Sequence, residues 1–93
     1  MAFYAYILRC ADGSYYVGHT DDIEKRVAEH QQGLITVYTR KRRPVKLVFA
    51  EDFATRYEAL SAERQIKGWS RAKKEALING NWTRLKALAR NLY

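Results

Sequence analysis

The sequence has a single cysteine, few acidic residues and no long apolar run. One cysteine, Cys10, excludes an internal disulfide and a zinc site built from several cysteines. Its place in a strand-like segment favours a small buried hydrophobe over a reactive thiol. The longest apolar runs are only a few residues, and no charged leader precedes an apolar core, so neither a membrane span nor a secretory signal is expected. The expected location is the cytoplasm.

Acidic residues are outnumbered by basic ones. Ten Asp and Glu stand against 17 Lys and Arg in 93 residues, which gives a formal net charge of +7. In a soluble domain this excess favours a polyanionic partner such as DNA or RNA. Passive RNA-binding proteins share the composition, so charge alone does not separate an enzyme from a binding module. A chain of this length suits one domain with a modest core.

The chain also lacks repeats and low-complexity linkers, and short elements fill it. Residues 3–10 and 14–19 are rich in aromatic and β-branched side chains and predict two antiparallel strands around a turn. Residues 45–51 alternate well enough for a third strand. Helices are expected over residues 21–32, 55–67, 70–79 and 81–93. The prediction is an α+β fold with a small three-stranded antiparallel sheet flanked by helices, in the order β-β-α-β-α-α-α.

The turn between the first two strands decides whether two tyrosines meet. A two-residue Asp12-Gly13 turn would put Tyr6 and Tyr16 on opposite faces of the sheet. A three-residue loop over residues 11–13, with Gly13 left-handed, would put them on the same face. The sequence permits both turns, and we favour the three-residue loop.

One helix carries a charge on its apolar side. The apolar residues of the helix over 55–67 share one arc of a helical wheel: Tyr57, Ala59, Leu60 and Ile66. Glu63 lies inside this arc, and Thr55 with Glu58 predicts a capping box at the helix start. Because an unpaired buried carboxylate is costly, Glu63 is expected to meet a metal ion or a basic side chain. An intrahelical pair with Lys67 is the structural alternative.

The first predicted helix repeats this arrangement with basic residues. With Ile23 at the centre of the inward stripe, His30 lies about 20° and Arg26 about 60° to one side. Asp21 and Glu24 are expected to cap the helix start. Two helices thus direct residues suited to phosphate or metal chemistry toward the sheet, where several tyrosines lie.

These residues form a recognisable set. They are Tyr4-Ala5-Tyr6, Tyr16-Val17-Gly18 ten positions later, Arg26, His30 and Glu63. With the Asp-Ile-Glu-Lys-Arg helix start and the AERQIKGWSRAKKEALI stretch, the set resembles the GIY-YIG nuclease domain. It is most similar to small stand-alone bacterial members, and to the N-terminal nuclease module of the excision-repair subunit UvrC. The resemblance covers residues 3–79 of one domain spanning 1–93, with 81–93 as a C-terminal helix.

The resemblance implies a metal-dependent endonuclease that hydrolyses phosphodiester bonds in DNA, in a repair or recombination setting. Glu63 would hold Mg²⁺ or Mn²⁺, since Mg²⁺ prefers hard oxygen ligands. Catalytic roles are implied for Tyr6, Tyr16, His19, Arg26 and His30. One tyrosine would activate the attacking water, and the other would orient it or hold the phosphate. Nucleases of the family often use a late asparagine, for which Asn79, Asn81 and Asn91 are candidates.

The remaining candidates have open alternatives. Arg26 has the charged planar fork that suits a phosphate gaining charge. His19 is either a proton carrier or a polar strand end, and His30 is either functional or a hydrogen-bonded core residue. Gly18 is expected to be architectural, through close approach of backbone or substrate or through relief of a bulge.

A basic surface is expected to bind the nucleic-acid backbone, with DNA favoured over RNA. The residues proposed for it are Arg40, Lys41, Arg42, Arg43, Lys67, Arg71 and Lys73. Such runs are often only solvated loops, and no signature of base-specific reading is present. Specificity would come from substrate structure or a protein partner. The alternative function is a basic nucleic-acid-binding module on the same scaffold without efficient turnover.

Overall fold

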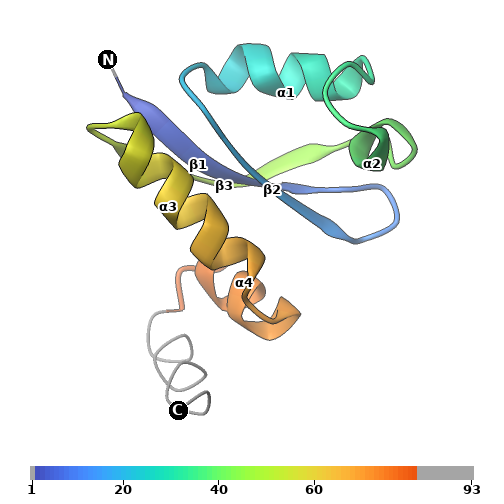
Figure 1. Cartoon of the computed structure of the whole chain (residues 1–93). Helices are drawn as coiled ribbons and strands as arrows, with labels where there is room; N and C mark the ends of the chain where they lie inside the picture. The colour runs from blue at the N-terminus through green and yellow to red at the C-terminus, as the bar shows by residue number, and fades with distance from the viewer. Residues whose placement is uncertain (1, 82–93) are drawn as a thin grey trace.

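A computed structural model describes residues 2–81, which form a three-stranded sheet with helices on both faces (Figure 1). The elements are β1 (Phe3–Arg9), β2 (Tyr15–Thr20), α1 (Ile23–Gln31), α2 (Val37–Arg40), β3 (Lys46–Phe53), α3 (Arg56–Lys67) and α4 (Arg71–Ile78). The predicted α+β class and the antiparallel sheet are confirmed. The short helix α2 was not predicted. The helix predicted over 81–93 lies, apart from its first residue, outside the described residues.

β1 is the central strand, in the order β2-β1-β3, and both of its neighbours run antiparallel to it. Its side chains alternate between two apolar clusters. Tyr6 and Leu8 face the side covered by α1, whereas Ile7 packs with Ile66 of α3 and Leu77 of α4 on the other side. The edge of β2 that faces away from β1 has no partner strand within residues 2–81.

The β1–β2 turn is the three-residue loop. The Cys10 amide donates to the Ser14 carbonyl at 2.8 Å, and Gly13 has φ +84°, a conformation that glycine adopts without strain. In the resulting register Tyr6 lies opposite Gly18. The favoured prediction is confirmed, because this register places the two motif tyrosines on one face.

The start of α1 differs from the prediction by one residue. The Asp22 carboxylate, not that of Asp21, accepts the N–H of Lys25 and caps the helix. Asp21 instead forms an exposed ion pair with Arg56. Two adjacent aspartates give the same capping signal, and the backbone decides between them. The predicted end is confirmed, with Gly33 at φ +76° after the last turn.

Residues 38–43, a basic run expected to form a loop ahead of the third strand, lie partly in α2. Thr36 caps this helix by accepting the N–H of Thr39, whose side chain is completely buried. A helix of four residues is too short to show a hydrophobic period, which is why the sequence pattern missed it.

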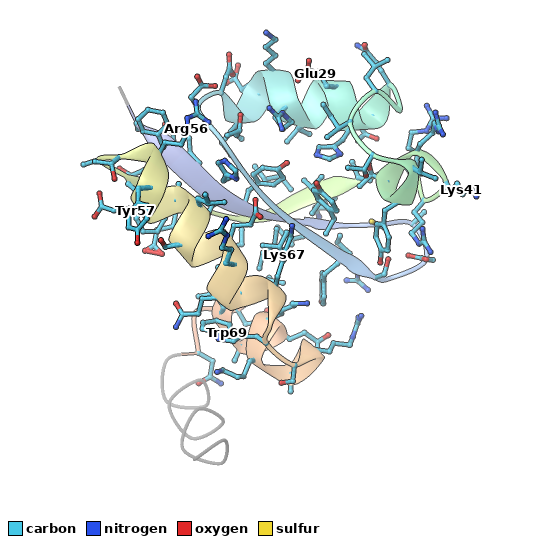
Figure 2. The ribbon with its side chains drawn as sticks, viewed as in Figure 1. Glu29, Lys41, Arg56, Tyr57, Lys67 and Trp69 are labelled. Atoms are coloured by element: carbon cyan, nitrogen blue, oxygen red, sulfur yellow. The ribbon has the colours of Figure 1, made fainter. Side chains whose placement is uncertain are left out.

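Helix α3 confirms the capping box of Thr55 and Glu58 and the inward position of Glu63. Tyr57 was expected on the inward arc, but it is 77% exposed and lies on the outer side of the helix (Figure 2). It sits about 120° from Glu63 on the wheel, at the rim of the arc and beyond the strip that the sheet covers. Among residues 2–81, no helix has the length and apolar character required to cross a membrane.

Candidate active site

The candidate residues meet at the free edge of β2, between α1 and α3. Alternation along β2 sends Tyr16 to the face under α1 and His19 to the face under α3. Two groups of side chains therefore approach the edge from opposite sides of the sheet. The group on the α1 side contains Tyr6, Tyr16, Arg26 and His30, and the group on the α3 side contains His19, Glu63 and Lys67.

An aromatic cluster forms the centre of the α1 side. The ring centroids of Tyr16 and His30 lie 4.9 Å apart, and those of Tyr6 and Tyr16 lie 6.4 Å apart. Gly18 makes room for this cluster, since a Cβ there would lie 2.5 Å from the Tyr6 hydroxyl oxygen. The missing side chain admits the Tyr6 ring, whereas the sequence predicted an approach of backbone or substrate at this glycine.

The Tyr6 hydroxyl and His30 are joined by a buried hydrogen bond, with 2.9 Å between Oη and Nε2. The other ring nitrogen, Nδ1, lies 2.8 Å from Oγ1 of Thr39. Burial, reinforced by the charge of Arg26, lowers the pKa of His30 to about 4. Burial also raises the pKa of Tyr6 well above its usual value, and the nearby Tyr16 adds to this. At neutral pH the pair is an uncharged imidazole and an uncharged phenol.

Arg26 brings an unsatisfied donor to the same place. Its Nε is buried and makes no hydrogen bond within residues 2–81, although a carboxylate oxygen of Glu29 lies 3.5 Å away in an ion pair. Buried donors are nearly always paired in native proteins, and a guanidinium pairs especially well with phosphate. Arg26 therefore has the chemistry of an anion contact beside Tyr6.

On the α3 side, Glu63 has two basic neighbours. Its Oε1 lies 2.7 Å from Nδ1 of His19, and its Oε2 lies 3.0 Å from Nζ of Lys67. Burial by itself would raise the pKa of Glu63, but the hydrogen bonds from His19 and Lys67 outweigh it, and the pKa is lowered. The carboxylate is ionised at neutral pH. The structural alternative for Glu63, the pair with Lys67, is present, and His19 adds a second partner.

A divalent cation fits this donor set only if the substrate supplies some of its ligands. Within residues 2–81 no three His, Cys, Asp or Glu side chains converge to hold a metal. Mg²⁺, however, keeps several waters and binds through one or two carboxylates together with substrate phosphates. Glu63 supplies one ionised carboxylate at an edge that nucleic acid could reach. The residues present fit a cation that substrate helps to hold.

A groove runs from this edge toward α2 and encloses about 430 Å³. Its lining combines aromatic and basic side chains and consists of Tyr15, Tyr16, Val17, Thr36, Tyr38, Lys67 and Lys74. Lys67 thus borders both Glu63 and the groove. Arg40 and Lys41 are exposed close by on α2 and the residue after it.

The other predicted nucleic-acid contacts have structural partners. Arg42 stacks on Tyr38 and pairs with Asp12, and Arg43 donates to two backbone carbonyls. Arg71 donates to the carbonyl of Gly13 and stacks on the ring of Tyr15. Lys73 is only 6% exposed, with its ammonium 4.4 Å from the centroid of a Trp69 ring. Its burial gives Lys73 a packing role that the charge pattern did not indicate.

A comparison with known proteins supplies the family. Residues 2–76 match the GIY-YIG catalytic domain. The chain belongs to the GIY-YIG family. This is a nuclease superfamily, and its nucleases generally depend on divalent metal ions. The resemblance drawn from the tyrosine tripeptides is thereby confirmed.

Relatives within the GIY-YIG family extend along most of the chain. A "UPF0213 protein" from Bacillus pumilus (strain SAFR-032) is 49% identical over 75 residues, covering 81% of this chain and 76% of the relative. The "UPF0213 protein YazA" from Bacillus subtilis (strain 168) is 48% identical over 73 residues, covering 78% and 74%.

Two solved structures are similar as well. The solution NMR structure of the UPF0213 protein BH0048 from Bacillus halodurans has a TM-score of 0.57 at 42% identity, covering 87% of this chain and 86% of that chain. The solution NMR structure of the protein EF2693 from E. faecalis has a TM-score of 0.60 at 43% identity, covering 86% and 85%. This chain therefore shares its fold with these two structures.

Two site-related features escaped the sequence interpretation. Thr39 contacts His30 from α2, and Tyr38 lines the groove. Thr36 is a residue type that favours a helix N-cap, but nothing in the sequence links Thr39 to a histidine nine positions earlier. Of the late asparagines, Asn79 is the C-cap of α4, and Asn91 lies outside the described residues.

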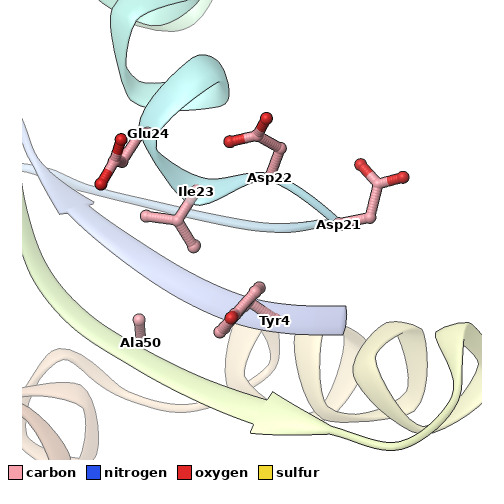
Figure 3. A pocket seen from close by; sticks show the side chains of 6 residues that line it. All are labelled: Tyr4, Asp21, Asp22, Ile23, Glu24 and Ala50. Atoms are coloured by element: carbon pink, nitrogen blue, oxygen red, sulfur yellow. The ribbon is translucent and has the colours of Figure 1, made fainter. Parts of the chain in front are cut away.

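A second pocket lies at the start of α1 and has the opposite charge (Figure 3). It is lined by Tyr4, Asp21, Asp22, Ile23, Glu24 and Ala50. All three carboxylates are exposed, and two of them have structural partners in a helix cap and an ion pair. An acidic surface of this kind repels phosphate.

Proposed function

We propose that this protein is an endonuclease that hydrolyses phosphodiester bonds in DNA with the help of Mg²⁺ or Mn²⁺. The observation that carries the proposal is that the uncharged Tyr6–His30 pair lies within electrostatic reach of both Arg26, with its unsatisfied donor, and the ionised Glu63, whose charge helps to raise the pKa of Tyr6. Phosphodiester hydrolysis requires a base for water, charge stabilisation on the phosphate and stabilisation of the leaving oxygen. The edge of β2 offers a group for each role.

Tyr6 is proposed as the group that takes a proton from the attacking water. A phenol with a raised pKa is a poor acceptor unless its own proton leaves at the same time. His30 Nε2, at 2.9 Å, is placed to receive that proton as the water O–H bond breaks. Arg26 helps to lower the pKa of His30, so a phosphate bound to Arg26 offsets this effect and makes the imidazole a better base.

Arg26 is proposed to bind the scissile phosphate. Its guanidinium stays charged at all relevant pH values and donates in a fixed plane that matches phosphate oxygens. Because negative charge on those oxygens grows during attack, the contact strengthens in the transition state, which is the requirement for a rate effect. Tyr16, in ring contact with His30, would orient the water or hold the phosphate.

Glu63 would hold the cation, which when bound supplies Lewis-acid stabilisation of the leaving oxygen. The hydrogen bonds from His19 and Lys67 keep the carboxylate ionised and fix its orientation. Lys67 also extends this side of the site into the groove, where an ammonium suits a neighbouring phosphate of the strand. Specificity is proposed to come from substrate structure or from a protein partner.

The same contacts support a second candidate, a nucleic-acid-binding module without efficient turnover. Both oxygens of Glu63 already have cationic or hydrogen-bonding partners within the chain, so the carboxylate is neutralised without a metal. Such a module would bind DNA through Arg26 and the groove and leave it intact. Cleavage assays separate the two candidates.

The decisive experiment uses labelled duplex, single-stranded and branched DNA with Mg²⁺, Mn²⁺ or EDTA. Wild-type protein is compared with Glu63→Gln and with a matched control, Glu51→Gln, which removes an exposed carboxylate on β3. We expect metal-dependent cleavage that falls about a hundredfold or more in Glu63→Gln and is unchanged in the control. Tight binding without cleavage on every substrate would favour the binding module, and equal cleavage by both variants would contradict the role of Glu63.

A further inference from the structure

A chain of hydrogen bonds leads from Tyr6 through His30 into α2. Tyr6 Oη and His30 Nε2 lie 2.9 Å apart, and His30 Nδ1 and Thr39 Oγ1 lie 2.8 Å apart. The hydroxyl oxygens of Thr39 and Thr36 are separated by 3.0 Å. Tyr6 is 1% exposed, and His30 and Thr39 are both fully buried. Because solvent hardly reaches these groups, the donors and acceptors must satisfy one another.

Two directions are conceivable for the hydrogens of this chain. In the first, Nδ1–H of His30 donates to Thr39, and Nε2 accepts from the Tyr6 hydroxyl. In the second, the Thr39 hydroxyl donates to Nδ1, and Nε2–H donates to Tyr6. The two directions correspond to the two tautomers of the neutral imidazole. Only the first leaves Nε2 free to receive a proton.

The surrounding acceptors select the first direction. In the second, the Tyr6 hydroxyl would need another acceptor, and within residues 2–81 the only acceptor that contacts it is His30. Arg26 also hydrogen-bonds to Tyr6, but a guanidinium has donors alone and cannot accept. In the first direction, the Thr39 hydroxyl has two acceptors, Oγ1 of Thr36 at 3.0 Å and the carbonyl of the same residue at 3.5 Å. Each donor in the chain from Tyr6 through His30 to Thr39 then has an acceptor.

We propose that Thr39 is a positioning residue of this site: its hydroxyl accepts Nδ1–H of His30 and thereby holds Nε2 as the proton acceptor for Tyr6. The catalytic part of this inference rests on the proposed function, whereas the tautomer does not. Thr39 is itself fixed by the start of α2, where its N–H donates to the Thr36 hydroxyl at 3.1 Å. The cap of a four-residue helix thus orients a group two contacts away.

The tautomer is tested by NMR on protein with ¹⁵N-labelled histidine. The chain has two histidines, so spectra of His19→Gln protein contain His30 alone. We expect the proton on Nδ1 in the otherwise wild-type protein, a loss of this preference in Thr39→Val and its restoration in Thr39→Ser. Thr20→Val, which changes another buried threonine, is the matched control. The proposal would be overturned by a proton on Nε2 in the protein that keeps Thr39, or by an unaltered Nδ1–H in Thr39→Val.

The catalytic consequence is measured on the same Thr39 substitutions with His19 retained. Because general acid–base catalysis contributes roughly a hundredfold or more, we expect Thr39→Val to lower kcat at least about tenfold with KM little changed, and Thr39→Ser to recover most of it. Wild-type turnover in Thr39→Val would refute the positioning role. If the wild-type protein shows the expected tautomer and cleaves nothing, the endonuclease proposal fails and the tautomer assignment stands.

Discussion

Two charged hollows of this protein, the pocket at the start of α1 and the candidate site at the edge of β2, differ in what surrounds their charges. The pocket at the start of α1 has three carboxylates, all exposed, and its lining includes no basic residue (Figure 3). The edge of β2 has one carboxylate, Glu63, which is 9% exposed and contacts two basic side chains. The number of acidic residues is therefore a poor guide to chemistry. Burial and the partners of a charge decide what it can do.

The largest contrast is expected between two arginines. Arg26→Ala should lower the cleavage rate about a hundredfold to a thousandfold, because it removes a charge placed for the phosphate. Arg56→Ala, beside the acidic pocket, removes the exposed pair with Asp21 and the stacking on Phe3, and should leave cleavage within about twofold. Steady-state rates on one DNA substrate measure both. Equal rates for the two variants would remove the distinction between the hollows.

The pH dependence of the free energy of unfolding should report the burial of a neutral His30. The unfolded chain protonates His30 near its ordinary pKa of 6.5, whereas the folded protein does so at about 4. The free energy of unfolding should therefore fall by about 1.4 kcal/mol per pH unit between these values, roughly 3 kcal/mol in all, as pH is lowered. Because its pKa is lowered, Glu63 contributes to the pH dependence of the free energy of unfolding only at more acidic pH.

Urea unfolding of wild-type and His30→Gln protein between pH 7 and pH 4.5 measures this contribution. The wild-type curve should fall more steeply, since His30→Gln has no such group to titrate. Parallel curves would contradict the burial of a neutral His30.

Two tyrosines on the same face of β1 sharpen the comparison further. Tyr6→Phe leaves Nε2 of His30 without its partner and should cost about 1–3 kcal/mol in the free energy of unfolding, together with cleavage. Tyr4→Phe, in the lining of the acidic pocket, should change neither quantity appreciably. Thermal or urea unfolding with matched cleavage assays gives both readouts. A stable, active Tyr6→Phe protein would exclude the phenol as the proton carrier.

The smallest effects are expected for the basic residues near α2. Lys41→Ala should weaken DNA binding and reduce the slope of log K against log salt concentration by about 1, with no change in stability. Arg42→Ala should also lower stability, because Arg42 stacks on Tyr38 and pairs with Asp12. Binding titrations at several salt concentrations, beside unfolding curves, separate the two. An unchanged slope in Lys41→Ala would place that lysine away from the phosphates.

Features with a clear period or a distinctive turn could be predicted from the sequence. The three-residue loop at Gly13, the capping box at Thr55 and the inward Glu63 follow from local geometry that few alternatives share. The tyrosine tripeptides identified the family, because their spacing is fixed by pairing across the β1–β2 hairpin.

Features that depend on tertiary contacts could not be predicted. Lys73 reads as a surface charge, but the ring of Trp69 covers its ammonium. Tyr57 reads as apolar and inward, but no part of the sheet reaches it. The contact of Thr39 with His30 depends on α2 folding back over α1, which no short-range pattern reports. A helical wheel or a charge run describes one element by itself and does not report what packs against it, and that packing decides the surroundings of all three residues.

The outer edge of β2, which has no partner strand within residues 2–81, restricts how this protein can associate with others. Unpaired N–H and C=O groups on an edge strand attract a further strand from another chain. A strand added to β2 would lie along the edge where Tyr16 and His19 approach from opposite faces of the sheet, and it would block access to the candidate site. Self-association along this edge would therefore exclude the proposed nucleic-acid substrate from the site. The outer edge of β3, on the far side of the sheet, is where a partner could add a strand and leave the site open.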